Sequence, residues 1–212
     1  WIGVGGDPIP MSSRSGRPIA ALPVTNDVEI TRLVERDTLL AHAFRPYDPS
    51  FDHWFNQVFY SNQDRTVTLN TSRAIAGRTG TWRVQIADNT STPASQPNRT
   101  LNIRKGPTTI NSLVYKGTGT NEVTAVLAAN QLNAGTTDFT FRITASGATP
   151  LVGLLRYIAL TYPREAVLEN GVLTFTQSRS ERNLRVEGFT TGAPWLLDTT
   201  DSRRPVRLTG AQ

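Results

Sequence analysis

Short segments in which apolar and polar residues alternate recur along most of the chain, and this pattern constrains the fold more than any other feature. In residues 64–72, for example, Val67 and Leu69 lie two positions apart. Successive side chains of a β-strand point to opposite faces, so a period of two predicts a strand with one buried face. The same pattern recurs in residues 80–88, 99–106 and 137–145, and residues 171–177 are expected to form a further strand.

The spacing of these segments predicts the fold class. About eleven of them follow one another at intervals of roughly 8–12 residues, as in β-sandwiches and barrels. Residues 154–165 are apolar on both faces, which is typical of a central strand. In residues 50–59, aromatic and aliphatic side chains recur at helical spacing, and the same residues also suit a buried aromatic strand.

We therefore expect an all-β protein whose main part is a jelly-roll-like β-sandwich over residues 30–165. Residues 1–29 are rich in proline, glycine and serine, and are expected to form an extended arm or linker. Residues 166–212 are expected to form a small antiparallel β unit or the start of a further β domain. The chain opens on Trp1 and is expected to be a piece or processed form of a longer protein.

Composition excludes several classes of function. The chain has no cysteine, which removes disulfides, a thiolate nucleophile and cysteine-type zinc sites. Its net charge of +5 comes from scattered arginines without interleaved aromatic residues, so we expect no nucleic-acid groove. No apolar run is long enough to span a membrane.

Histidines and paired carboxylates are the candidates for catalysis, and none forms a convincing constellation. His42 lies in an apolar run and His53 among aromatic residues, so both are expected to be structural. The pairs Asp48 with Asp52 and Asp198 with Asp201 would suit glycoside cleavage or a calcium site if each faced a cleft. Both pairs also suit turns, where aspartate accepts hydrogen bonds from nearby backbone N–H groups. We expect no catalytic residue and no cofactor, with calcium as the alternative.

Tryptophan offers one candidate for ligand binding. Trp82 alternates in phase with Val84 and Ile86 and is expected to face the core, and Trp54 lies in an apolar cluster. Trp195 follows a proline and is expected to be an exposed platform on which a sugar could stack.

Several motifs in the second half of the chain resemble gingipain-like cysteine peptidases (the C25 family), including the related sortase of the type IX secretion system. The family has a strand of the type Y-P-R, an N-G-x-L-x-F element, a G-F strand and a D-x-T-D turn. The matching residues are Tyr157, Ile158, Leu160, Tyr162, Pro163, Arg164, Asn170, Gly171, Leu173, Phe175, Gly188, Phe189, Asp198, Thr200, Asp201, Pro205, Val206 and Leu208. Upstream, residues 1–16, 32–44 and 51–55 resemble further family segments in the same order. Ser202 departs from the family's usual proline.

The resemblance implies the non-catalytic, β-rich region that precedes the peptidase domain, since the family's catalytic cysteine and histidine lie in a downstream α/β domain. It implies an accessory domain of a secreted or cell-surface bacterial peptidase, which supports or positions the catalytic domain of the same polypeptide. A carbohydrate- or surface-binding module that contacts a glycan or cell-surface component is the alternative, and a free-standing glycosidase is a third reading.

Overall fold

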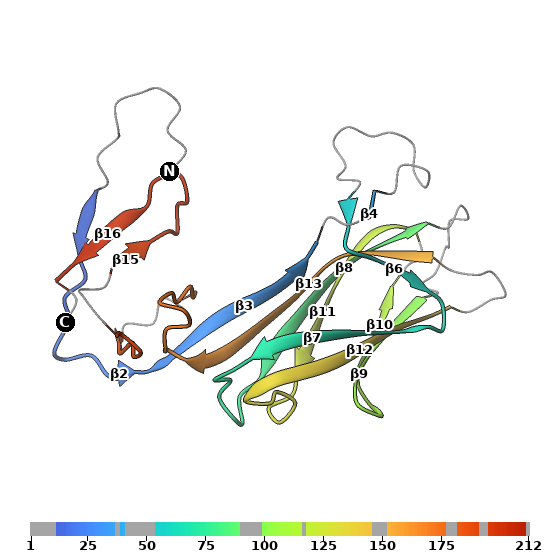
Figure 1. Cartoon of the computed structure of the whole chain (residues 1–212), viewed down its shortest axis with the longest axis horizontal. Coiled ribbons are helices and arrows are strands. Elements are labelled where there is room, and N and C mark those ends of the chain that lie inside the picture. Colours follow the sequence, from blue (N-terminus) through green and yellow to red (C-terminus); the bar gives the residue numbers. More distant parts are fainter. Residues whose placement is uncertain are drawn as a thin grey trace, which may run out of the picture. The chain divides into compact units, whose positions relative to one another are not determined.

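The computed structural model describes residues 12–36, 39–40, 54–89, 99–115, 118–145, 152–176, 182–190 and 195–210. The described residues contain strands, turns and bridges and no α-helix, so no helix capable of crossing a membrane occurs among them. The chain divides into two compact units. One unit, Asp27–Glu165, is called the sandwich unit here, and the other, which combines the residues before and after it, is called the split unit (Figure 1).

Two large antiparallel sheets and one short two-stranded sheet make up the described part of the sandwich unit. Its strands are β3 (Asp27–Glu35), β4 (Leu39–Leu40), β5 (Trp54–Phe55), β6 (Gln57–Tyr60), β7 (Asp64–Thr71), β8 (Gly80–Asn89), β9 (Arg99–Lys105), β10 (Thr108–Tyr115), β11 (Thr118–Leu127), β12 (Gly135–Ala145) and β13 (Val152–Glu165). One sheet has the order β10-β9-β12-β7 and the other the order β11-β8-β13-β3, with β6 pairing to β13. Strands β4 and β5 pair with each other. The predicted all-β, jelly-roll-like sandwich is confirmed.

The core lies between the two sheets and is centred on Trp82. This side chain on β8 is fully buried, as predicted from its alternation with Val84 and Ile86. Its ring packs edge-on against Phe139 and Phe141 of β12, at 4.7 and 5.6 Å between ring centroids. Because β8 and β12 belong to opposite sheets, these contacts join the two layers.

Residues 50–59 suited either a helix or a buried strand, and the described part of this segment, from residue 54 onward, contributes to strands β5 and β6. Phe55 and Phe59 are buried, and the backbone N–H of Asn56 donates to the carbonyl of Leu155 on β13. Pairing with the long central strand decides against a helix, since it satisfies the backbone hydrogen bonds between strands and buries both aromatic rings.

The described residues of the split unit contain five short strands. They are β1 (Ser13–Ser15), β2 (Val24–Thr25), β14 (Asn183–Leu184), β15 (Leu196–Asp198) and β16 (Val206–Thr209). Strand β1 pairs in parallel with β16, and β2 pairs in parallel with β14. Strands β15 and β16 form the predicted antiparallel hairpin. The N-terminal stretch, expected to be an arm, thus supplies two strands of this unit.

The side chain of Asn183 fixes a further part of the N-terminal stretch. Its amide oxygen accepts a hydrogen bond from the backbone N–H of Ile19, at 2.9 Å. Its amide nitrogen donates to the carbonyl oxygens of Ile19 and Leu22, at 2.8 and 3.1 Å. The hydrogen bonds of this one side chain therefore hold the backbone at Ile19 and Leu22, as backbone hydrogen bonds would in a longer strand.

The segment at residues 171–177, expected to be a strand, forms none among its described residues. Val172 makes only an isolated bridge with Glu169, around a turn in which Asn170 and Gly171 have positive φ values of 52° and 79°. The left-handed turn reverses the chain locally, and the alternation of apolar residues in this segment does not continue into a strand among the described residues.

Candidate functional site

Trp195 immediately precedes β15, in the three-stranded sheet ordered β1-β16-β15. Its side chain is 71% exposed, the largest exposed fraction among the exposed large apolar residues that the structure describes. The sequence singled out Trp195 as an exposed platform; whether it binds a ligand stays a prediction.

The register of this sheet determines which side chains share a face with Trp195. Leu197 lies opposite Arg207, and Arg207 lies opposite Ser13. Since side chains alternate along each strand, one face of the sheet carries six residues, which we call the Trp195 face. They are Ser13, Ser15, Trp195, Leu197, Arg207 and Thr209, and all six are exposed.

Arg207 is a charged partner of Trp195. Its guanidinium carbon lies over the indole ring, 4.6 Å from the ring centroid. A cation held over an aromatic face at an exposed site is stabilising by roughly 0.5–1 kcal/mol. Sequence reasoning missed Arg207, because it lies on the neighbouring strand and only the register of β15 against β16 reveals the pair.

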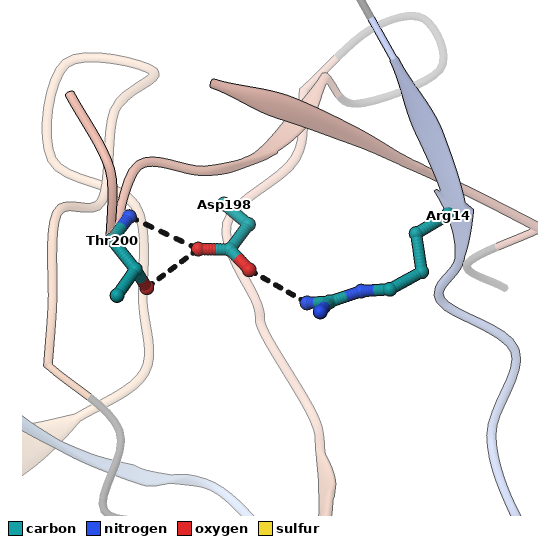
Figure 2. A network of polar contacts seen from close by, with 3 residues as sticks. All are labelled: Arg14, Asp198 and Thr200. Carbon is teal, nitrogen blue, oxygen red and sulfur yellow. Dashed lines mark hydrogen bonds and ion pairs between the residues drawn. The ribbon is translucent and has the colours of Figure 1, made fainter. Parts of the chain in front are cut away.

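Asp198 anchors a polar network on the opposite face of the same sheet (Figure 2). Its carboxylate accepts hydrogen bonds from the Thr200 hydroxyl at 2.6 Å and from the Thr200 backbone N–H at 3.0 Å. The other carboxylate oxygen forms an ion pair with Arg14 at 2.6 Å. The hydrogen bonds from Thr200, and secondarily the charge of Arg14, hold the pKa of Asp198 below its ordinary value of 3.8.

Asp201 closes the turn that follows. Its carboxylate accepts a hydrogen bond from the backbone N–H of Arg203 at 3.0 Å, and its carbonyl accepts one from the N–H of Arg204 at 3.0 Å. The prediction that Asp198 and Asp201 are turn residues of the β15–β16 hairpin is therefore confirmed.

The described residues provide no metal-binding or catalytic site for the other candidate residues. No group of three or more histidine, aspartate or glutamate side chains that could hold a metal ion occurs in the described part of the chain. His42, His53, Asp48 and Asp52 lie outside the described residues, as does the side chain of Trp54. The predictions made for these residues, and the calcium alternative, stay predictions.

A second polar cluster lies on the outer face of the sandwich unit. The phenol of Tyr157 donates a hydrogen bond to Glu122, and the guanidinium of Arg83 lies 5.6 Å from the centre of the Tyr157 ring. Tyr157, Gln85 and Glu122 stand side by side on β13, β8 and β11. Burial, together with the hydrogen bond and the negative charge of Glu122, raises the pKa of Tyr157 above its ordinary value of 10.0.

Comparison with known proteins gives likenesses of structure only. No protein-family model matches the chain, and no curated protein matches it. The structure resembles the crystal structure of dimeric latent PorU from Porphyromonas gingivalis, with a TM-score of 0.58 and 13% sequence identity. The likeness covers 81% of this chain and 16% of PorU.

Weaker likenesses connect the chain with carbohydrate-binding modules. A CBM36-1 domain of a multidomain xylanase, from the hindgut metagenome of Trinervitermes trinervoides, has a TM-score of 0.41 and 14% identity. The likeness covers 62% of this chain and 96% of that domain. A CBM36 module in complex with calcium and xylotriose has a TM-score of 0.35 and 17% identity, and covers 64% of this chain and 99% of the module. At 13% identity, the likeness to PorU is one of fold alone.

Proposed function

We propose that this chain is a non-catalytic accessory domain of a secreted or cell-surface, gingipain-like cysteine peptidase of bacterial origin. The observation that carries the proposal is the likeness to PorU, which covers most of this chain and a small part of that protein. It agrees with the order of the sequence motifs that resemble the C25 family, from residues 1–16 to the D-x-T-D turn at Asp198. On this proposal, a peptidase domain of the same polypeptide is the partner.

The split unit supports a docking role because it buries little apolar surface of its own. Among its described residues, Ala166 is the one fully buried apolar residue. Six large apolar side chains are exposed instead: Ile19, Val24, Val172, Phe189, Trp195 and Leu197. A unit of this size needs a buried core or an external partner for stability, and exposed apolar side chains are typical of interaction surfaces.

The proposed mechanism is the burial of surface and the fixing of geometry, without bond chemistry. Val172 and Phe189, which are 64% and 46% exposed, would pack against the peptidase domain. Burial of apolar side chains of this kind contributes roughly 1.5–3 kcal/mol each. The sandwich unit would then act as a rigid support, and no residue of this chain would contact the scissile bond.

The test uses the complete polypeptide that contains this chain. We expect Val172→Ser combined with Phe189→Ser to lower the melting temperature of the peptidase domain and the yield of active enzyme. Val114 and Val126 of the sandwich unit are 63% and 65% exposed, so Val114→Ser combined with Val126→Ser is the matched control. Unchanged yield and melting temperature in both double variants, or a neighbouring region without a cysteine and histidine, would contradict the proposal.

A second candidate function is a carbohydrate- or surface-binding module. The exposure of Trp195 and its position on an exposed sheet face favour this function, because sugars stack on open aromatic rings. A glycan array probed with the isolated 212-residue chain, with and without calcium, separates the two functions. Absence of binding would leave the accessory role, and calcium-dependent binding would support the calcium alternative.

A further inference from the structure

We propose that Trp195 and Arg207 together form a binding site for an acidic polysaccharide, in which Trp195 stacks on a sugar ring and Arg207 pairs with its carboxylate. The proposal rests on the second candidate function, and it adds the charge class of the ligand and a second residue. The two side chains lie on neighbouring strands of the split unit and are in contact.

The contact between the two residues prepares the ring for stacking. The Arg207 guanidinium lies over the indole of Trp195 at 4.6 Å, yet the Trp195 side chain remains 71% exposed. The cation therefore lies against one ring face while most of the surface of Trp195 remains open to solvent. A tryptophan has only two side-chain torsions, and the contact with Arg207 restricts them before a ligand arrives, which lowers the entropic cost of binding.

The charge of Arg207 is available to a ligand. The structure gives Arg207 no carboxylate partner among the described residues, whereas Arg14 is paired with Asp198 on the opposite face. None of the six residues of the Trp195 face is acidic. A planar guanidinium carries donors that match a carboxylate in a two-pronged arrangement, and that arrangement selects an anionic ligand.

The rest of the Trp195 face suits a sugar. Ser13 and Thr209 carry hydroxyl groups beside Arg207 and Trp195, and Leu197 adds an exposed apolar side chain. A pyranose ring has an apolar C–H face and peripheral hydroxyl groups. The C–H face can stack on the Trp195 ring, and the hydroxyl groups can form hydrogen bonds with Ser13 and Thr209. Because the ring is exposed on a sheet face, it can meet an internal unit of a long polymer.

The experiment measures binding of the full 212-residue chain by affinity electrophoresis in gels that contain polygalacturonate, hyaluronate or alginate. Each polymer is compared with its methyl ester, which keeps the sugar backbone and removes the charge. We expect retardation in at least one acidic polymer and an affinity lower by about tenfold or more for its ester, the factor that corresponds to losing one charge-assisted pair.

Variants assign the effect to the two residues. Trp195→Ala should abolish retardation, Arg207→Ala should remove the preference for the acidic polymer, and Arg207→Lys should retain part of it because the charge remains. Arg185→Ala is the matched control, since Arg185 is an exposed arginine of the same unit that pairs with Glu187. All three positions are exposed, and circular dichroism checks that each of the four variants is folded.

The alternative outcomes are distinguishable. Equal retardation by an acidic polymer and its ester would overturn the acidic-ligand inference while the carbohydrate-binding function stands. Retardation by none of the polymers would overturn the inference, and a blank glycan array beside it would remove the second function too. Competition by polyglutamate as strong as that by the polysaccharide, or an equal loss in Arg185→Ala, would show that general attraction to acidic polymers explains the binding.

Discussion

Arg14 and Asp198 are 184 positions apart in the sequence and form an ion pair of 2.6 Å that spans the middle strand of a three-stranded sheet. Arg14 lies on β1 and Asp198 on β15, with β16 between them. The pair therefore links the two outer strands across one face (Figure 2). Backbone hydrogen bonds join each of these strands to β16.

The stability of the split unit should depend on the ionisation of Asp198. Because folding lowers its pKa below 3.8, the stabilisation is complete above that pH and is lost as the pH falls through the lowered pKa. We expect Asp198→Asn to speed amide hydrogen exchange at Thr200 at neutral pH, and the difference from the wild type to shrink in acid. A difference that persists at the lowest pH would contradict this role.

The two partners of Asp198 should contribute unequally to its pKa. The hydrogen bonds from Thr200 are the largest cause of the lowering, and the ion pair with Arg14 is smaller. We therefore expect Thr200→Ala to raise the pKa of Asp198 more than Arg14→Gln does, measured by NMR titration of the carboxyl carbon. The reverse order would show that the ion pair dominates.

Asp201 should stabilise the hairpin through its hydrogen bond to the backbone N–H of Arg203. We expect Asp201→Ala to lower the free energy of unfolding by about 1 kcal/mol, as the loss of a local cap does. Asp201→Asn keeps an oxygen acceptor and is the matched control, with a smaller loss. Urea unfolding followed by circular dichroism measures both, and an unchanged midpoint in Asp201→Ala would count against the turn role.

Trp82 should be the most sensitive position of the sandwich core. It is fully buried and contacts two aromatic rings of the opposite sheet, so Trp82→Ala should cost about 3–5 kcal/mol. Its indole N–H has no hydrogen-bond partner among the residues that the structure describes. Trp82→Phe removes that unpaired group and keeps a ring, so we expect a much smaller loss in urea unfolding. Equal losses in the two variants would contradict this account.

The sandwich unit was predictable because its strands bury one face each. In the middle of β7, β8, β9 and β12, apolar residues two positions apart enter the shared core, and the predicted ranges lie within two residues of the observed strands. The burial of the Trp82 side chain was predicted from the same alternation. Because the two sheets pack face to face, the apolar residues of the alternating pattern are the ones that become buried.

The split unit was less predictable, because its strands bury little. Strand β1 has the sequence Ser-Arg-Ser and all three residues are exposed, so no apolar alternation marks it. Its parallel pairing with β16 joins residues that lie far apart in the sequence, which no local signal encodes. Trp195 could be identified as a candidate from the sequence. Its contact with Arg207 could not, because only the register of the sheet brings the two residues together.

Tyr157 offers a test of the polar cluster on the sandwich. Burial is the largest cause of its raised pKa, and the hydrogen bond to Glu122 comes next, so Glu122→Gln should bring the pKa back toward 10.0. Ultraviolet absorbance of the phenolate, with Tyr157→Phe subtracted, measures it. Glu35→Gln is the matched control, since Glu35 stands opposite Tyr157 in the register and is not among the causes of the shift. Because the folded pKa is raised, the associated stability is present below pH 10.0 and is lost as the pH rises through the higher pKa. A pKa that moves as far in Glu35→Gln as in Glu122→Gln would assign the shift to the general negative charge of the sheet face.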